Sequence, residues 1–256
     1  MNVIITGGAA GIGRAVASLC AARGDAVTIL DRREAAAEQA AHEALKLGAS
    51  GALALACDVS SEDQVEQSIA KSIDKFGPPD GVLANAGIDI GGWIHELPLD
   101  TWRQVIDTNL TGVFLTSKHA LRRMLAAGIR GSIVCTSSPN GFVALAGGAV
   151  GAYSASKAGI SALVRCMAVD YAKYGIRVNA IVPGATETGL MWNNVRPEDV
   201  PGMREQLNRE IPLGRLGQPA DIARAIVWLL SAESAYVTGA QIVVDGGILA
   251  KSCISV

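Results

Sequence analysis

The chain of 256 residues has few aromatic side chains and little excess charge of either sign. Only 4% of its residues are Phe, Trp or Tyr although half are hydrophobic, so Ala, Val, Leu and Ile must build the core. The formal net charge is −2 and no basic patch stands out. Since a nucleic-acid-binding protein normally carries such a patch, we expect no nucleic acid partner.

Disulfide and metal-ligand patterns are also missing. The five cysteines are Cys20, Cys57, Cys135, Cys166 and Cys253. They form no CxxC pair and four lie within apolar runs, which predicts buried free thiols in a reducing, cytoplasmic compartment. The three histidines are far apart and have no recognisable ligand spacing, so we expect no metal site.

No segment has the pattern of a secretory signal or a membrane span. The first residues, MNVIITGG, lack a basic region followed by a long apolar stretch. The longest uncharged stretch, 131–156, contains Pro139, Asn140 and several serines and glycines, which would expose polar groups in lipid. We therefore expect a buried soluble core and no membrane partner.

Short β-branched runs alternate with longer helical patterns along the chain. Strands are predicted over 2–6, 26–30, 52–57, 81–85, 132–136 and 176–183, with a last short strand in AQIVVDGG (240–247). Helices are predicted over 11–23, 33–47, 99–127, 153–174, 203–210 and 220–230, and one more is capped by Ser60 or Ser61 and ends at Gly77. This alternation predicts βαβ units in an α/β domain with a largely parallel sheet covered on both faces.

A glycine-rich segment, TGGAAGIG (6–13), lies where the first predicted strand turns into the first helix. Gly7, Gly11 and Gly13 allow a tight turn there and let backbone N–H groups approach a pyrophosphate at the helix N-terminus. The spacing differs from the GxGxxG pattern, so the segment alone also fits a plain tight turn.

An acidic residue, Asp31, ends the second predicted strand. A carboxylate there can accept hydrogen bonds from the adenosine ribose and repel a 2′-phosphate, which favours NAD over NADP. Arg32 and Arg33 follow directly and weaken this preference, because an arginine can pair with that phosphate.

Tyr153 stands four residues before Lys157 in GAYSASKAGISAL (151–163). Residues at this spacing lie on one helix face. A lysine charge within about 4–6 Å favours the phenolate, whose pKa is ordinarily about 10. The pair could then accept the hydroxyl proton of a secondary alcohol while a hydride leaves, although YxxxK alone also fits an exposed pair on an alanine-rich helix.

Several ordered motifs together resemble the short-chain dehydrogenase/reductase family over almost the whole chain. They are TGGAAGIG, CDVS (57–60), ANAG (84–87), TNLTG (108–112), Ser137-Ser138, YSASK (153–157), IRVNAIVPG (176–184) and VTGAQIVVDGG (237–247). The resemblance implies one NAD(P)-binding domain over 1–256, a Rossmann-type doubly wound sheet of about seven mostly parallel strands, and a substrate loop at about 186–212. It also implies a homotetramer assembled through the two long central helices.

The resemblance implies a catalytic tetrad of Asn109, Ser138, Tyr153 and Lys157. Tyr153 would be the base for oxidation and the acid for reduction, and Lys157 would also hold the nicotinamide ribose. Ser138 would bond the substrate oxygen, and Asn109 would hold a water that links Lys157 to solvent. Ser137 remains an alternative to Ser138, because the segment 139–152 is longer than is usual in the family.

Cofactor contacts are implied by the same resemblance. They are Gly7, Gly11, Ile12, Gly13, Asp31, Arg32, Asp58, Val59, Asn85, Ala86, Gly87, Tyr153, Lys157, Pro183, Gly184 and Thr188. Asp58 and Val59 would meet the adenine, and Thr188 would bind the nicotinamide carboxamide. Ala84 departs from the family, which more often has a second asparagine before Asn85.

Three segments, 89–95, 139–150 and 186–203, are expected to line a substrate pocket. They offer Trp93, Phe142, Leu145, Met191, Trp192, His95, Glu187, Asn193 and Asn194. This mixture fits a cyclic or medium-sized secondary alcohol with some polar decoration, and polyols, sugar acids, alicyclic alcohols and steroids all remain open. The sequence thus predicts an oxidoreductase that transfers a hydride between NAD(H) and a small-molecule secondary alcohol or ketone. The alternatives are an NADPH-dependent carbonyl reductase and a non-catalytic NAD-binding protein.

Overall fold

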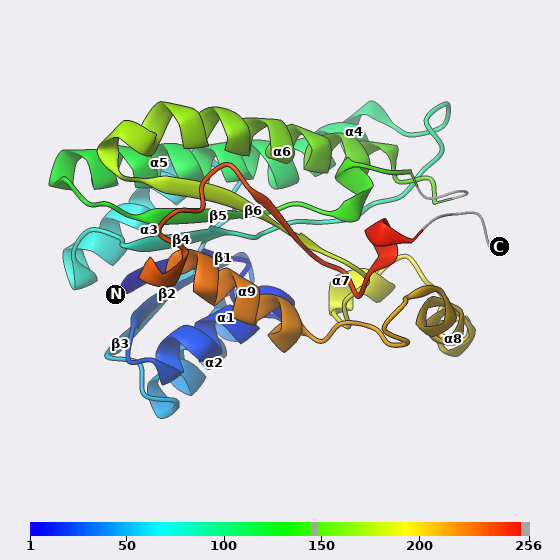
Figure 1. Ribbon diagram of the computed structural model, residues 1–256, viewed down its shortest axis with the longest axis horizontal. Helices are drawn as coiled ribbons and strands as arrows, with labels where there is room; N and C mark the ends of the chain where they lie inside the picture. The colour runs from blue at the N-terminus through cyan, green and yellow to red at the C-terminus, as the bar shows by residue number, and fades with distance from the viewer. Residues whose placement is uncertain (145–147, 252–256) are drawn as a thin grey trace.

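The computed structural model describes residues 1–144 and 148–251 and shows one sheet between two layers of helices (Figure 1). The strands are β1 Asn2–Thr6, β2 Ala26–Asp31, β3 Gly51–Ala56, β4 Gly81–Ala84, β5 Ser132–Thr136, β6 Arg177–Pro183 and β7 Gln241–Val244. Their order is β3-β2-β1-β4-β5-β6-β7, and every neighbouring pair is parallel. The predicted α/β fold with about seven strands is confirmed. Leu145 and Cys253 lie outside the described residues.

The helices cover both faces of the sheet. They are α1 Gly11–Ala22, α2 Glu34–Lys46, α3 Glu62–Phe76, α4 Leu99–Ile106, α5 Gly112–Ala127, α6 Gly151–Tyr171, α7 Gly189–Trp192, α8 Val200–Glu210 and α9 Pro219–Leu230. In Figure 1, α3 to α6 lie above the sheet and α1, α2 and α9 below it. Among the described residues, none of the helices is both long and apolar enough to cross a lipid bilayer.

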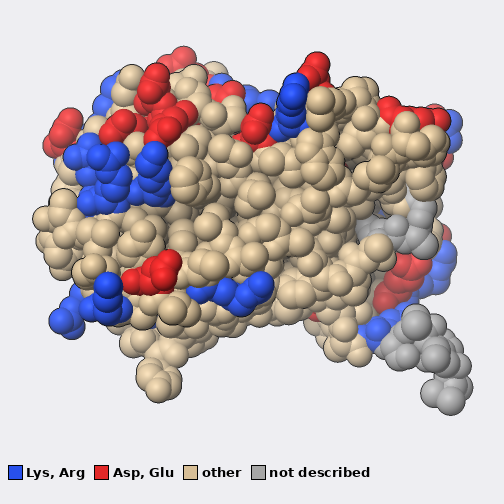
Figure 2. Space-filling model, turned by 90° about the horizontal axis from the view of Figure 1, so that it is seen from above, with Lys and Arg blue, Asp and Glu red and all other residues tan. Residues whose placement is uncertain are grey.

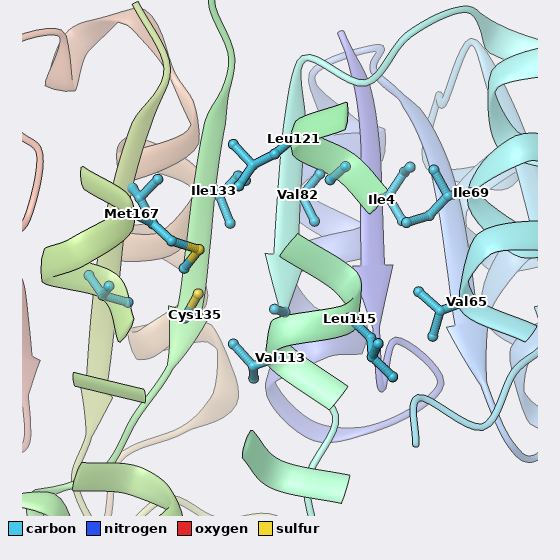
Figure 3. Close-up of a cluster of buried hydrophobic side chains, with 14 of the residues drawn as sticks. Ile4, Val65, Ile69, Val82, Val113, Leu115, Leu121, Ile133, Cys135 and Met167 are labelled. Atoms are coloured by element: carbon cyan, nitrogen blue, oxygen red, sulfur yellow. The ribbon is translucent and has the colours of Figure 1, made fainter. Parts of the chain in front are cut away.

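The central strands are buried on both faces, which explains why their sequences are continuous apolar runs. All five residues of β1 and of β5 are buried. Side chains from these strands pack against α3, α5 and α6 on one side and against α1, α2 and α9 on the other. Figure 3 shows the first of these clusters, with Ile4, Val82, Ile133 and Cys135 of the strands among helix residues that include Val65, Leu121 and Met167.

The strand order reverses between β1 and β4. From β1 the chain builds outward through β2 to β3, then returns to β4 on the other side of β1 and continues to β7. In doubly wound sheets, ligands bind outside the carboxyl ends of the strands at such a reversal. The loops that follow β1, β4, β5 and β6 therefore frame the candidate site.

Some local predictions differ from the structure. The helix predicted over 99–127 is interrupted by a π-helical turn at Asp107–Thr111, and the helix predicted from Tyr153 begins two residues earlier. Ser61 is at the N-cap of α3, but its side chain makes no capping hydrogen bond within the described residues. Cys20, Cys57 and Cys135 are buried as predicted, whereas Cys166 is exposed because it lies on the outer face of α6.

Candidate active site

The glycine-rich turn between β1 and α1 depends on glycine at defined positions. Gly7 and Gly11 have positive φ angles of 63° and 53°, a region that other residues enter only with strain. A Cβ on Gly13 would lie 2.3 Å from the Gly7 carbonyl oxygen, and one on Gly7 would lie 2.9 Å from Ala86 Cα. Ala10 precedes α1 and has no side-chain oxygen to cap it, so the first N–H groups of the helix remain suited to an anion. Ile12, in the first turn of α1, packs against the core beneath.

Asn85 connects the ends of three strands. Its Nδ2 donates to the carbonyl oxygens of Thr6 (3.2 Å) and Gly7 (3.3 Å), and its Oδ1 accepts from Thr136 Oγ1 (3.1 Å). Thr6 Oγ1 in turn accepts from the backbone N–H groups of Asn85 and Ala86. Neither Thr6 nor Thr136 is among the site residues predicted from the sequence, although both stand at strand ends beside predicted motifs, which is a usable signal.

The acidic residue at the end of β2 is buried and already has several donors. Asp31 accepts from the N–H of Ala9 (3.3 Å) and from the N–H and Nε of Arg33 (3.1 and 3.2 Å). Arg32 is exposed. The arginine that pairs with Asp31 is therefore Arg33, which is not among the cofactor contacts predicted from the sequence.

Asp58 and Val59 follow β3 at the same edge of the sheet. Asp58 is exposed and its carboxylate accepts from Ser60, while Val59 is buried against Gly112, where a Cβ would approach to 2.7 Å. Only Asp58 thus presents its side chain to solvent.

Asn109 lies in the π-helical turn and is completely buried. Its Oδ1 accepts from the Ile88 N–H (2.8 Å), and its Nδ2 donates to the Ile88 carbonyl (2.9 Å) and to Ser156 Oγ (3.2 Å). A Cβ on Gly87 would lie 3.3 Å from Asn109 Oδ1 and 3.7 Å from Lys157 Nζ. Asn109 therefore fixes the segment after β4 close to the lysine.

The two serines after β5 have different surroundings. Ser137 is buried and its hydroxyl bonds the Lys157 carbonyl (3.1 Å) and Ser161 Oγ (3.1 Å). Ser138 accepts from the Asn140 N–H (3.2 Å) and is close enough to Tyr153 to lower its pKa by hydrogen bonding. This geometry favours Ser138 over Ser137 as the residue that faces a substrate.

Tyr153 and Lys157 lie together on α6. The lysine Nζ is 5.3 Å from the centroid of the tyrosine ring and donates to the Thr136 carbonyl (2.8 Å). Burial raises the pKa of Tyr153 to about 12 and lowers the pKa of Lys157 to about 8. The lysine is predicted from the sequence to lower the pKa of Tyr153. In the structure burial raises this pKa, Ser138 lowers it through a hydrogen bond, and the charge of Asp89 raises it further.

The expected pocket segments are joined to one another. Gly92 donates its N–H to the Ala149 carbonyl (2.7 Å), and Ala149 has a positive φ of 46°. Asn194 donates to the Asp89 carbonyl (3.2 Å), so the loop after β4 contacts the segment after α7.

Several side chains expected to contact substrate have other surroundings. Glu187 accepts from Trp192 Nε1 (2.7 Å) and forms an ion pair with Arg204 of α8, so it is a poor candidate for a substrate contact. Trp93 and Phe142 are about half exposed. The remaining candidates described are His95, Met191 and Asn193, of which His95 is the exposed partner of Glu96.

The loop after β6 reaches back to the glycine-rich turn. A Cβ on Gly11 would lie 3.2 Å from Thr188 Cγ2, and one on Gly184 would lie 2.5 Å from Asp245 Cα. Pro183 is the buried last residue of β6. Thr188 is thus beside the first turn of α1, as its expected contact with the cofactor requires.

The chain is similar over nearly its whole length to known oxidoreductases. The family described as enoyl-(acyl carrier protein) reductase matches residues 7–249. A cis-4-hydroxycyclohexanecarboxylate dehydrogenase of Sinomonas cyclohexanicum is 44% identical over 96% of each chain. A 2,5-dichloro-2,5-cyclohexadiene-1,4-diol dehydrogenase of Sphingobium indicum is 38% identical over 97% of each chain. A crystal structure of a short-chain type dehydrogenase/reductase from Mycobacterium marinum has a TM-score of 0.91 and 35% identity, covering 99% of this chain and 96% of the other.

Proposed function

The chain belongs to the short-chain dehydrogenase/reductase family, and on this basis we propose that it transfers a hydride between NAD(H) and a secondary alcohol or ketone. Dehydrogenases of this family use NAD or NADP. The observation that carries the proposal is the proximity of Tyr153 to Ser138 and Lys157 beside the carboxyl ends of the strands. These groups can move a proton at the substrate oxygen, which hydride transfer requires.

A nicotinamide dinucleotide fits the residues at the strand reversal. The glycine-rich turn has no space for side chains at Gly7 and Gly13, which supports a close approach of its backbone to a pyrophosphate. Asp31 would accept from the adenosine ribose, Lys157 would hold the nicotinamide ribose and Thr188 the carboxamide. The bound nicotinamide would supply the hydride acceptor or donor.

The preference for NAD rests on Asp31. Its buried carboxylate would repel a 2′-phosphate, and the neighbouring Arg33 is already paired with it. The exposed Arg32 favours NADP instead, because its guanidinium could pair with the 2′-phosphate. We therefore propose NAD as the preferred cofactor.

Tyr153 is proposed as the general acid and base. Because its pKa is raised to about 12, the hydroxyl is protonated near neutral pH and can donate to a ketone oxygen during reduction. For oxidation the phenolate must be stabilised, and Lys157 and Ser138 are the groups placed to do so. The protonated hydroxyl suits reduction, and together with the exposed Arg32 it supports the second candidate function, an NADPH-dependent carbonyl reductase.

The substrate we propose is a cyclic or medium-sized secondary alcohol. Partly exposed aromatic side chains, Trp93 and Phe142, lie in segments that flank the site. The two relatives described above act on ring compounds according to their names. The buried free thiols Cys20, Cys57 and Cys135 support a cytoplasmic location.

A homotetramer built through α5 and α6 is also proposed. Figure 2 shows the face over α4 to α6, where a broad area has no charged side chain. Phe114 of α5 and Val169 of α6 are exposed, Val169 to 79%. Such apolar exposure is typical of a surface that associates with another chain.

The test is a panel of secondary alcohols and ketones assayed with NAD, NADP and their reduced forms. We expect cyclic secondary alcohols to be oxidised with NAD, seen as growing absorbance of the reduced nicotinamide. Turnover of ketones with NADPH alone would favour the second candidate. Binding of NADH without turnover of any alcohol or ketone would contradict both and leave a non-catalytic NAD-binding protein.

A further inference from the structure

Asp89 lies on a segment whose backbone is fixed on both sides. The preceding residue, Ile88, exchanges two hydrogen bonds with the Asn109 side chain at 2.8 and 2.9 Å. Three residues later, Gly92 donates to the Ala149 carbonyl at 2.7 Å. The position of Asp89 is therefore defined by the same asparagine that belongs to the proposed tetrad.

One oxygen of the Asp89 carboxylate, Oδ1, is buried and has no hydrogen-bond partner among residues 1–144 and 148–251. Buried carboxylate oxygens in folded proteins are normally hydrogen-bonded, and leaving one without a donor is destabilising. The backbone carbonyl of Asp89, in contrast, accepts from Asn194 Nδ2 at 3.2 Å. At Asp89, the backbone carbonyl is therefore hydrogen-bonded within the protein, whereas the buried carboxylate oxygen has no partner among the described residues.

The segment that carries Asp89 lies beside the proposed proton-transfer pair, since a Cβ on Gly87, two residues before Asp89, would lie 3.3 Å from Asn109 Oδ1 and 3.7 Å from Lys157 Nζ. The carboxylate is within electrostatic range of both members of the pair. Its negative charge raises the pKa values of Tyr153 and Lys157, and the lysine charge partly offsets the rise that burial causes in the pKa of Asp89. Asp89 is therefore close to the groups that are proposed to act on the substrate oxygen.

The cation whose charge acts on Asp89 has another partner. Lys157 donates to the Thr136 carbonyl at 2.8 Å. Within the described part of the chain, no salt bridge is formed by Asp89. A hydrogen-bond donor from outside the chain would satisfy the free oxygen.

We propose that Asp89 accepts a hydrogen bond from a second hydroxyl group of the substrate and so selects neutral diols over alcohols that carry a carboxylate. The proposal rests on the proposed function, because it takes the hydroxyl that reacts at Tyr153 as the first of the two. An ionised carboxylate only accepts hydrogen bonds, which suits a hydroxyl donor. A carboxylate on the substrate would instead bring two negative charges together at a poorly hydrated position.

The experiment compares kcat/KM for three kinds of substrate. Cyclohexanol carries one hydroxyl, the isomeric cyclohexanediols place a second hydroxyl at each ring position, and a hydroxycyclohexanecarboxylate carries an anion instead. Each is assayed with NAD using the wild type, Asp89→Ala and Asp89→Asn. Asp100→Asn is the matched control, because Asp100 is an exposed carboxylate on α4.

The wild type is expected to prefer its best diol over cyclohexanol by about tenfold or more, beyond the statistical advantage of two hydroxyls, as for a hydrogen bond to a charged group. Asp89→Ala should remove this preference. Both Asp89 variants should improve the hydroxy acid relative to cyclohexanol, and Asp100→Asn should change neither ratio. Because all three substrates need the same proton transfer, the ratios cancel any change in the pKa of Tyr153.

An unchanged diol preference in Asp89→Ala and Asp89→Asn would overturn the assignment, as would a wild-type preference for the hydroxy acid over both other substrates. If cyclohexanol is oxidised without any preference for a diol, the proposed function stands and only the role of Asp89 fails. If none of the alcohols is oxidised, the proposed function itself fails, and the role of Asp89 with it.

Discussion

The two sides of the candidate site differ in how completely their polar groups are hydrogen-bonded and their space is filled by other atoms of the protein. On the proposed cofactor side, the turn after β1 leaves no space for a side chain at Gly7 or Gly13, and the Asn85 amide is hydrogen-bonded to the ends of β1 and β5. On the substrate side, Trp93 is half exposed and a buried oxygen of Asp89 has no partner within the described chain. The cofactor side is thus closely specified by the backbone, whereas the substrate side leaves groups free for a ligand.

The largest effect on cofactor binding is expected at Gly13, where the backbone leaves no space for a side chain. Gly13→Ala would place a Cβ 2.3 Å from the Gly7 carbonyl oxygen, so the turn must shift and NADH affinity should fall by more than about 100-fold, the equivalent of a few kcal/mol of strain. Calorimetric titration with NADH measures the affinity, and the melting temperature reports the strain.

Gly202→Ala is the matched control, because a Cβ there would meet no atom of the described residues within 4 Å. It should bind NADH like the wild type and melt at the same temperature or slightly higher. Wild-type affinity in Gly13→Ala would contradict the view that backbone approach defines the cofactor side.

Lys157 lies between the two sides, and its burial makes stability depend on pH. Its pKa is lowered from 10.5 to about 8, so below pH 8 the folded protein must bury a charged amine, while above pH 10.5 the amine is neutral whether folded or unfolded. Wild-type stability relative to Lys157→Met should therefore rise by about 3 kcal/mol between pH 8 and 10.5. Denaturant unfolding of both proteins across this window measures the difference, and a constant difference would show that the lysine is not desolvated.

The cofactor preference should depend on Asp31. Removing its carboxylate takes away the repulsion of a 2′-phosphate and frees Arg33, so Asp31→Ala should lower the NAD-to-NADP ratio of kcat/KM by about tenfold or more. Asp63→Ala, which removes an exposed carboxylate from α3, should leave the ratio unchanged. A wild type that already prefers NADP would refute this role of Asp31.

The smallest effect is expected on the substrate side at Glu187. Glu187→Gln loses the partly exposed ion pair with Arg204 but can still accept from Trp192. Because such pairs contribute about 0.2–1 kcal/mol, KM for the alcohol should rise by no more than about fivefold while kcat changes little. Steady-state kinetics separates the two constants, and a large loss of kcat would mean that Glu187 contacts the reacting groups after all.

The difference between backbone-defined and loop-defined parts of the site also explains which features could be predicted from the sequence. Strands such as β1 are buried on both faces, so their apolar runs revealed the parallel sheet. Gly7 and Gly13 could be found because their positions require the absence of a side chain. The YxxxK spacing placed Tyr153 and Lys157 on one helix face, which the structure has.

Features that depend on contacts between distant segments could not be predicted. Nothing in the sequence around Asn109 indicates a π-helical turn, which is fixed by hydrogen bonds to Ile88 and Ser156. The pairing of Glu187 with Arg204 and the unpartnered oxygen of Asp89 also depend on how loops pack. Desolvation of Tyr153 reversed the expected direction of its pKa for the same reason.

The most direct test of the proposed chemistry is Tyr153→Phe, which removes one hydroxyl and keeps the ring beside Lys157. If Tyr153 is the general acid and base, kcat with the best alcohol should fall by about 10²–10⁴-fold, while NADH affinity stays within about threefold of wild type. Near-wild-type turnover in Tyr153→Phe would contradict the account, because proton transfer would then not require this hydroxyl.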